Sequence, residues 1–306
     1  MNMLTIEKPH MKYKYSTVSV THLKELRDDI DKLRQDDKLS HNETFLSYIK
    51  NKTFELPDEM PNAKFLIIVA SYTKLARITF NYNESKLPIF IPPQYYYDGV
   101  TAEMIEDSLR QDVLKDSTQP LIRANGVLMK SAAVRSGLGK YGRNNICYVD
   151  EMGSFITLLG FFTEYEFLDD YWGERQLMEY CRTCNFCLNN CPTNAIRKEN
   201  FVIDAAKCVT LYNEVEGEFP KWIEPSVHNA MMGCLRCQYK CPGNRIAAKD
   251  LINLGELSAE ETRMILNQSI PEDKLQTVCD KLKMFKPEHS KTMLPIISRN
   301  LRVILK

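Results

Sequence analysis

The spacing of apolar residues along the chain predicts both helices and strands. Residues 21–36 carry apolar side chains at helical spacing among charged ones and predict an amphipathic surface helix, with Leu23, Leu26, Ile30 and Leu33 on its apolar face. Residues 64–72 contain the continuous apolar run Phe-Leu-Ile-Ile-Val-Ala, which suits a buried strand. Two further runs, 75–82 and 87–91, flank Asn-Glu-Ser-Lys and predict a hairpin that a Pro-Pro pair ends.

The middle and the end of the chain follow the same logic. Thr101 is placed to cap a helix over 101–115, a second helix fits 127–135, and apolar residues at 146–149 and 155–163 predict strands. Because helices and strands are mixed over the first 165 residues, we predict an α/β or α+β layered fold. Later, Ser258 and Glu261 have capping-box spacing, Pro271 can open a helix, and residues 291–306 favour another.

Eight of the ten cysteines form a pattern that points to metal chemistry. The first run begins at Cys181 and reads Cys-Arg-Thr-Cys-Asn-Phe-Cys-Leu-Asn-Asn-Cys-Pro. The second begins at Cys234 and reads Cys-Leu-Arg-Cys-Gln-Tyr-Lys-Cys-Pro, and Cys208 lies alone between the two runs. This spacing is typical of bacterial ferredoxins, in which the fourth cysteine of a run ligates the other cluster of a pair. The sequence therefore predicts two [4Fe-4S] clusters.

The ligands can be assigned by laying one run on the other. A shift of 50 residues superposes the two runs, except that Met231 is the counterpart of Cys181. If the last cysteine of each run crosses over, one cluster takes Cys181, Cys184, Cys187 and Cys241. The other cluster then takes Cys191, Cys234, Cys237 and, in the position that Met231 leaves, Cys208.

Other roles for the cysteines were weighed against this one. Zinc also binds Cys-x2-Cys pairs, yet a zinc site requires neither a third cysteine at the same spacing nor two Cys-Pro steps. Disulfides are disfavoured because the N-terminal residues do not read as a secretory signal. Cys147 and Cys279 lie outside the pattern, and we expect each to be a small buried hydrophobic residue.

Composition narrows the partners and the compartment. Lys and Arg total 40, as do Asp and Glu, so no overall field draws the protein to nucleic acid or to an anionic membrane. The sequence has no apolar run of about 18 residues. Residues 1–15 have no twin arginine or cleavage site, and we expect a cytoplasmic protein. We expect three parts: an α/β domain over 1–168, a ferredoxin-like double-cluster domain over 169–250 and a helical segment over 251–306.

A glycine-rich segment precedes the cysteines. Gly137, Gly139 and Gly142 match Gly-x-Gly-x-x-Gly, but a predicted helix precedes them and a predicted strand follows. A dinucleotide fingerprint needs the strand first, so that the N-terminus of the helix faces the pyrophosphate. We therefore do not predict a Rossmann site here, although glycines allow backbone to approach a ligand or another segment closely.

With these residues in view, the chain resembles the epoxyqueuosine reductase family and, more distantly, the corrinoid reductive dehalogenases. The resemblance covers roughly residues 66–246 and is strongest in three segments. Residues 133–145 resemble the family's glycine-rich signature, residues 204–214 its lone-cysteine segment, and residues 233–245 its second cluster run. In that family the equivalent of Cys208 ligates a cluster.

The resemblance implies an oxidoreductase in which a cobalamin-binding α/β domain adjoins a two-cluster ferredoxin module. Electrons would pass through the clusters to cobalt, and an aspartic acid would supply a proton. In a gap-free alignment Arg123 stands at that aspartate's position, and an arginine keeps its proton at neutral pH. The candidate cofactor-pocket residues are Gly139, Gly142, Asn144 and Ser154, and a turn-forming or capping role is the competing interpretation of each.

Three functions remain open at this point. The first is a corrinoid-dependent or similar reductase whose clusters feed a second redox centre, and the second is a non-catalytic electron-transfer protein that docks a partner enzyme. The third is a tRNA epoxyqueuosine reductase with a shifted proton donor, for which Asp98 and the carboxylates of residues 103–107 are candidates. Expected partners are a ferredoxin- or flavodoxin-type donor or an acceptor protein, a corrinoid or other small molecule and, least favoured by the neutral charge, tRNA. No membrane partner is expected.

Overall fold

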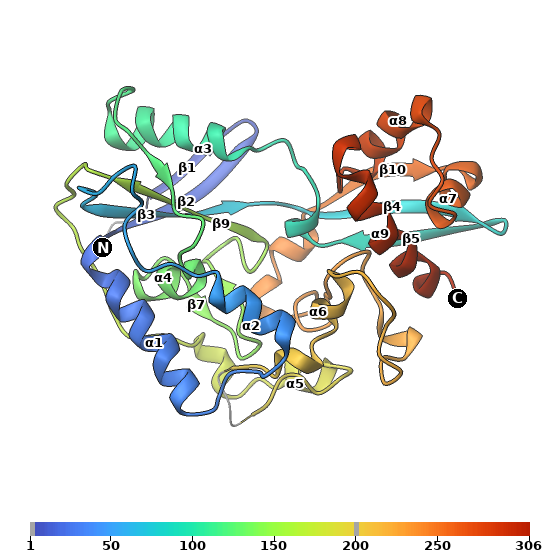
Figure 1. Ribbon diagram of the computed structural model, residues 1–306, viewed down its shortest axis with the longest axis horizontal. Coiled ribbons are helices and arrows are strands. Elements are labelled where there is room, and N and C mark those ends of the chain that lie inside the picture. Colours follow the sequence, from blue (N-terminus) through green and yellow to red (C-terminus); the bar gives the residue numbers. More distant parts are fainter. Residues whose placement is uncertain (1–3, 199–201) are drawn as a thin grey trace. The chain divides into compact units, whose positions relative to one another are not determined.

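Two β-sheets organise the part of the chain that this computed structural model describes, residues 4–198 and 202–306 (Figure 1). Each sheet belongs to a different unit. Unit 1 comprises the described parts of Met1–Tyr72, Gly99–Asn185 and Lys198–Val202, and unit 2 comprises Thr73–Asp98, Phe186–Arg197 and Ile203–Lys306. The mixture of helices and strands confirms the predicted fold class, while the three domain boundaries expected from the sequence stay a prediction.

The sheet of unit 1 is antiparallel throughout. Its five strands follow the order β1 (Leu4–Lys8), β2 (Met11–Ser19), β3 (Phe65–Tyr72), β9 (Ile156–Thr163) and β6 (Ile122–Arg123). The apolar runs at 64–72 and 155–163 thus form the two central neighbours β3 and β9, as predicted. Strands β1 and β2 were not predicted, because their tyrosines and lysines read as a polar segment.

Helices cover both faces of this sheet (Figure 1). Helices α1 (Leu23–Gln35) and α4 (Met129–Arg135) pack against the face that carries Leu66 and Ile68. Helix α3 (Ala102–Ser108) and the π-helical turn Leu109–Leu114 pack against Ile67 and Val69 on the other face. The alternation of side chains along a strand therefore builds a three-layer unit from β3. Helix α2 (Glu43–Lys50) buries no side chain fully.

Unit 2 is built on the predicted hairpin. Strands β4 (Leu75–Tyr82) and β5 (Ser85–Ile91) are antiparallel, and Asn83 and Glu84 form the turn between them with positive φ angles, as a two-residue hairpin turn requires. Strand β10 (Leu251–Leu257) joins β4 in parallel and completes the sheet. The sequence reading missed β10, which has a bulge at Gly255.

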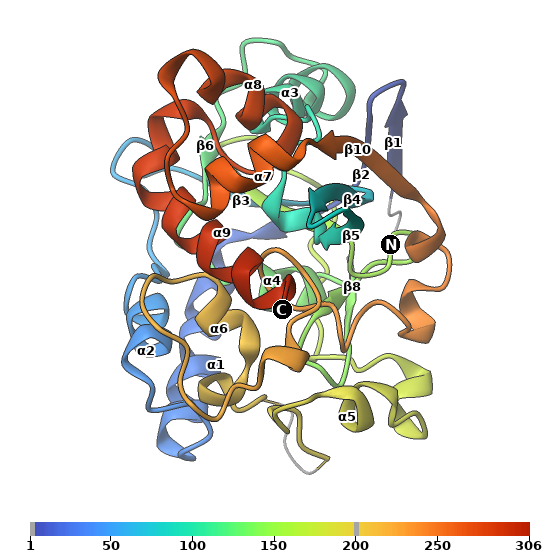
Figure 2. The ribbon, with the colours of Figure 1, turned by 90° about the vertical axis from the view of Figure 1, so that its right-hand side faces the viewer.

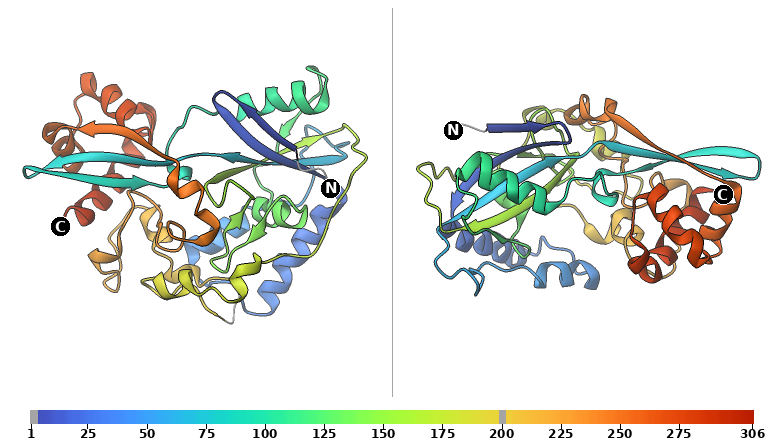
Figure 3. Two further views of the ribbon diagram at one scale, coloured as in Figure 1. Left: turned by 180° about the vertical axis from the view of Figure 1, so that it is seen from behind. Right: turned by 90° about the horizontal axis from the view of Figure 1, so that it is seen from above.

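Three helices cover one face of that sheet (Figure 3). They are α7 (Ala259–Leu266), α8 (Glu272–Leu282) and α9 (Ser290–Ile304). The capping box of Ser258 and Glu261 at the start of α7 is present, and Pro271 directly precedes α8, so all three helix starts lie close to their predicted places. None of the described helices is long and apolar enough to span a bilayer.

The cysteine-bearing stretch contains only short elements in its described part (Figure 2). Its α-helices are α5 (Phe186–Asn190) and α6 (Val209–Asn213). The other elements are single 3-10 turns: Glu179–Arg182, Ala205–Lys207, Pro225–Val227, Pro242–Asn244 and Ala247–Lys249. Turns of this length make few hydrogen bonds of their own, so the stretch depends on side chains and, where metal binds, on its ligands.

Candidate iron–sulfur site

Three of the cysteines assigned to one cluster come together in unit 2 from separate segments. Cys191 follows α5, Cys208 precedes α6, and Cys234 opens the second run, yet the three thiols are close enough to perturb one another. Burial raises the pKa of Cys234 to about 12, an amide hydrogen bond from Arg236 opposes the rise, and the thiols of Cys208 and Cys191 add to it. Burial also raises the pKa of Cys208.

Each of these three thiols accepts a hydrogen bond from backbone nearby. The amide of Ala195 donates to Cys191 Sγ over 3.3 Å. The amide and the hydroxyl of Thr210 donate to the Cys208 sulfur, and the amide of Arg236 donates to the Cys234 sulfur. Such donors stabilise negative charge on sulfur, which is the charge that a thiolate brings to a cluster.

The donor set fits iron–sulfur chemistry. All eight candidate ligands are thiols without a disulfide, and Cys181, Cys187 and Cys241 are buried. No three His, Cys, Asp or Glu side chains of the described residues converge as they would around one metal ion. A cubane does not need that arrangement, because each thiolate binds a different iron. The thiols whose pKa burial has raised must lose their protons as iron binds.

The start of the first run is positioned by a small hairpin within unit 1. Strands β7 (Lys140–Tyr141) and β8 (Cys147–Tyr148) follow α4 and pair with each other. Residues 176–178 then add to β7, since the amide of Tyr141 donates to the Gln176 carbonyl over 2.8 Å and the amide of Met178 returns a bond to Tyr141 over 2.9 Å. The turn that carries Cys181 begins directly afterwards. The glycine-rich segment therefore serves as a docking edge for the first run.

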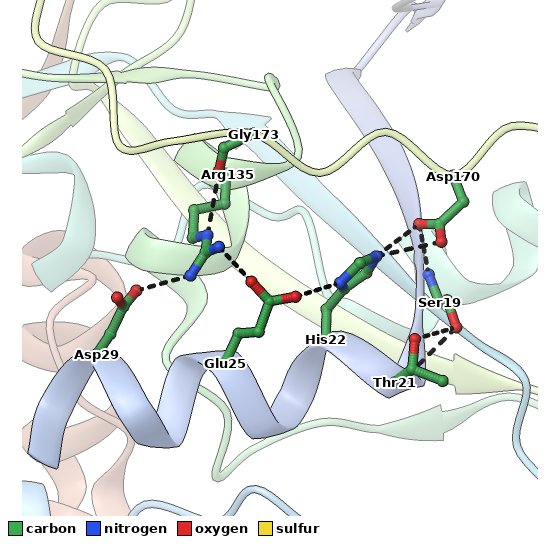
Figure 4. A network of polar contacts seen from close by, with 8 residues as sticks. All are labelled: Ser19, Thr21, His22, Glu25, Asp29, Arg135, Asp170 and Gly173. Atoms are coloured by element: carbon green, nitrogen blue, oxygen red, sulfur yellow. Dashed lines mark hydrogen bonds and ion pairs between the residues drawn. The ribbon is translucent and has the colours of Figure 1, made fainter.

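A second anchor ties the same segment to α1 in unit 1 (Figure 4). The Arg135 guanidinium donates to Glu25 at 2.5 Å, to Asp29 at 3.1 Å and to the Gly173 carbonyl at 3.1 Å. Arg135 is 9% exposed and Asp29 is partly buried, so the charge-assisted bond between them is partly shielded from water, while the Glu25 side chain is more exposed. The segment between β9 and the cysteines is thus held near α1 at Gly173, three residues before residues 176–178 pair with β7.

An imidazole extends this network to the next acidic residue. His22 lies between two carboxylates, with Nδ1 at 2.8 Å from Glu25 Oε1 and Nε2 at 3.1 Å from Asp170 Oδ2. Its ring stacks on Trp172 at a centroid distance of 4.6 Å, and the Arg135 guanidinium lies 4.7 Å from the same indole. Figure 4 shows His22, Glu25 and Arg135 in line along α1.

The four candidate cofactor-pocket residues lie in unit 1, and the contacts described for them are with neighbouring residues of the chain. A Cβ on Gly139 would lie 2.7 Å from Cys147 Sγ, and one on Gly142 would lie 2.4 Å from Asn144 Oδ1. Asn144 donates to the Tyr148 hydroxyl over 2.9 Å, and Asn144 and Ser154 are both buried. The contacts described for Gly139, Gly142 and Asn144 are therefore those of a tightly packed turn.

The other candidates have separate surroundings. The Arg123 guanidinium lies over the Phe161 ring at 5.3 Å. Asp98 accepts a hydrogen bond of 2.8 Å from the Thr73 hydroxyl, and on α3 both Glu106 and Asp107 pair with Arg110. Cys147 and Cys279 are buried in hydrophobic clusters, as predicted, and burial raises the pKa of these thiols to about 12 and about 11.

One acidic group escaped the sequence reading. Glu214, within unit 2, accepts a short hydrogen bond from the Tyr95 hydroxyl, and the Tyr95 ring packs against Gly233 beside the second run. Burial raises the pKa of Glu214, and the tyrosine opposes the rise. Glu214 is close enough to Cys208 to raise the pKa of that thiol. Glu214 is the last residue of the lone-cysteine segment 204–214. Its tyrosine partner lies 119 residues earlier in the chain, and no local sequence pattern records such a pairing.

The cysteine loops of unit 2 are also tied to the C-terminal helix. Asn300 on α9 donates to the carbonyls of Asn213 and Met231 at 2.9 and 3.0 Å. Asn213 in turn donates to the Gly233 carbonyl over 2.8 Å, and both asparagine side chains are fully buried. The residues that lead up to Cys234, the first cysteine of the second run, are therefore held through α9.

Comparison with known proteins agrees with this site. Residues 180–244 match the model of the 4Fe-4S double cluster binding domain family, and both runs and Cys208 lie within that range. The epoxyqueuosine reductase of Vibrio cholerae is 32% identical over 142 residues, which cover 46% of this chain and 37% of the relative. That of Escherichia coli is 30% identical over 140 residues, which cover 45% and 36%. The chain is thus similar to epoxyqueuosine reductases over nearly half of its length.

The solved structures of this family extend the likeness to the fold. An epoxyqueuosine reductase from Streptococcus thermophilus has a TM-score of 0.62 at 17% identity and covers 95% of this chain and 76% of its own. Another epoxyqueuosine reductase, solved with an epoxyqueuosine-modified tRNA stem loop, has a TM-score of 0.64 at 20% identity, with coverages of 95% and 76%. The chain spans less than half the length of the curated relatives that it matches.

Proposed function

We propose that this chain is an iron–sulfur oxidoreductase of the epoxyqueuosine reductase type. Two [4Fe-4S] clusters would deliver electrons to a second redox centre, or to a substrate, in the N-terminal α/β domain. The observation that carries the proposal is the grouping of Cys191, Cys208 and Cys234 from three segments, each with an amide donor, inside the double-cluster range. When bound, the clusters supply one-electron transfer; the chain desolvates them and fixes their ligands.

The ligand sets are part of this proposal. Cys181, Cys184, Cys187 and Cys241 hold one cluster, and Cys191, Cys208, Cys234 and Cys237 hold the other. Purified without air, the protein should contain about eight irons per chain. Cys208→Ser should lower that content to about four, whereas Cys279→Ser, which changes a buried cysteine on α8 outside the pattern, should leave it unchanged. A colourless protein that holds zinc would refute the redox function.

The candidate for the second redox centre is cobalamin. The family resemblance supports it, while a side chain at Gly139 or Gly142 would meet only neighbouring residues of the chain itself. Equilibrium dialysis of the iron-loaded protein against cob(II)alamin tests this part separately. Saturable binding of one corrinoid per chain supports it. Its absence favours the non-catalytic alternative, in which this chain relays electrons from a ferredoxin- or flavodoxin-type donor to a partner enzyme.

A second candidate function is the reduction of epoxyqueuosine in tRNA. It is favoured by the names of the relatives and by the related structure that contains an epoxyqueuosine-modified tRNA stem loop. A proton donor is needed, and Glu214, with its raised pKa, joins Asp98 as a candidate. Queuosine precursors in a deletion strain decide the matter, because the epoxide should accumulate without this chain and disappear when it is restored. If Glu214 donates the proton, Glu214→Gln fails to restore turnover while Asp98→Asn succeeds.

A further inference from the structure

The turn that carries Cys181 is held by an arginine from another segment of unit 1. Arg143 lies at the tip of the β7–β8 hairpin, between Gly142 and Asn144. Its Nη2 donates a short hydrogen bond to the Cys181 carbonyl, and its Nη1 donates to the Lys198 carbonyl over 3.3 Å. The guanidinium therefore contacts the backbone of a candidate cluster ligand directly.

The guanidinium of Arg143 is partly buried and has no ion-pair partner among the described residues. Its Nε is buried without a hydrogen-bond partner from that part of the chain. Cys181 itself is 6% exposed. A charge in a desolvated place acts more strongly on its neighbours than the same charge in water, because the local dielectric constant is lower.

Arg182 offers a natural contrast. It follows Cys181 directly in the chain, carries the same charge and is exposed to solvent. Arg236 is likewise exposed and lies near Cys234 of the other ligand set. Solvent and salt screen exposed charges, so the partly buried charge of Arg143 is screened less than that of Arg182, while the charge of Arg236 acts on Cys234 of the other ligand set.

We propose that Arg143 raises the reduction potential of the cluster that Cys181 ligates, an inference that rests on the proposed two-cluster function. Reduction adds one electron, and hence one negative charge, to a cluster. A nearby positive charge stabilises the reduced form, and net charge is among the factors that set cluster potentials. Removal of this charge should therefore lower the potential of the Cys181 cluster and leave that of the other cluster in place.

The test is a reductive titration of the air-free, iron-loaded protein, followed by voltammetry and by EPR. Three variants are compared with the parent chain. Arg143→Gln keeps a hydrogen-bond donor and removes the charge, Arg143→Lys keeps the charge, and Arg182→Gln removes an exposed charge from the residue that directly follows Cys181. Cys208→Ser, which perturbs the other ligand set, identifies the wave of the second cluster.

The expected result is selective. Arg143→Gln lowers the midpoint of the Cys181 cluster and leaves the other midpoint in place, while Arg143→Lys and Arg182→Gln leave both near the parent values. Unchanged midpoints in Arg143→Gln with full iron content, or an equal shift in Arg182→Gln, would overturn the inference. If Arg143→Gln does not load iron, Arg143→Lys decides, since a lowered midpoint with the charge retained contradicts it. A parent chain without two waves would instead refute the proposed function.

Discussion

Gly233 precedes the second cysteine run with a left-handed backbone, at φ of +63°. An alanine Cβ there would lie 2.6 Å from Cε2 of Tyr95. We expect Gly233→Ala to lower the free energy of unfolding by about 2–4 kcal/mol, since left-handed backbone costs about 1–2 kcal/mol and overpacking about 1–3 kcal/mol. Urea unfolding of the air-free protein, monitored by tryptophan fluorescence, measures the change.

Tyr95 supplies the control for that prediction. In a Tyr95→Ala background the steric part of the cost should disappear and the backbone part should remain, so the double-mutant cycle should show a coupling of at least about 1 kcal/mol. Additive effects would show instead that the tyrosine ring moves away freely. Glu214 loses its hydrogen-bond donor in that background, which is why Tyr95→Ala alone must also be measured.

Single residues also show what a sequence can and cannot reveal about the site. Cysteine ligands could be predicted because residue type and spacing express the chemistry of the metal. Arg143 could not, although it lies inside the glycine-rich signature, because its role depends on a backbone carbonyl in a distant segment. The same holds for Tyr95 and Glu214, whose pairing exists only after the hairpin and the lone-cysteine segment have met.

At the scale of elements, the capping box of α7 makes a defined contribution to stability. Glu261 accepts from the Ser258 amide at 2.7 Å and from Lys281 at 2.5 Å. We expect Glu261→Ala to lower the free energy of unfolding by about 1 kcal/mol at neutral pH. Glu260→Ala, which removes an exposed partner of Lys274 in the same turn, should change it by less than about 0.5 kcal/mol.

The contribution of Glu261 should also depend on pH. Burial alone would raise the pKa of this carboxyl, but the hydrogen bonds from Lys281 and Ser258 outweigh it and lower the pKa. A lowered pKa in the fold means that the stabilisation is complete above the ordinary glutamate pKa of about 4.3 and is lost as the pH falls through the lowered value. The free energies of unfolding of the parent protein and of Glu261→Ala should therefore converge in acid. A difference that stays constant with pH would contradict this role of Glu261.

Helix α9 connects the C-terminal core of unit 2 to the cysteine loops through the side chains of Asn300 and Arg299, which donate to backbone carbonyls of those loops. Asn300→Ala leaves the buried carbonyls of Asn213 and Met231 without their donor, and each unsatisfied group costs about 1–3 kcal/mol. We expect unfolding to become easier by about 2–4 kcal/mol and iron to be retained less well on dilution. Lys291→Ala, an exposed change on the same helix, should leave both properties alone.

Some strands could be predicted from local sequence patterns and others could not. The hairpin of β4 and β5 and the strand β3 were predictable because apolar runs and a turn signal lie next to each other in the chain. Strand β10 pairs in parallel with β4, which lies more than 150 residues earlier in the chain. Strand β2 carries tyrosines in place of an aliphatic run and pairs with β3. Long-range pairing, which no local pattern records, decided both.

At the scale of the whole molecule, the two sheets and the cysteine stretch should respond differently to the loss of iron. Strand β3 is almost fully buried and paired on both sides, whereas residues 203–250 contain only α6 and single turns. Amides such as those of Leu211 and Tyr239, bonded to Cys208 and Leu235, should lose protection from hydrogen exchange by more than about tenfold after chelation. Amides of β3 should keep theirs.

The comparison between iron-loaded and iron-free protein also separates two sources of order. The hydrophobic cluster within this stretch has Val209, Ile223 and Val227 as its buried members, while Met231 and Met232 pack into the C-terminal core of unit 2. We expect ligation to add to the order that these contacts provide. If protection were equal with and without iron, the asparagine network from α9 would have to hold the loops unaided, and the cysteines would be ligands added to an already rigid scaffold.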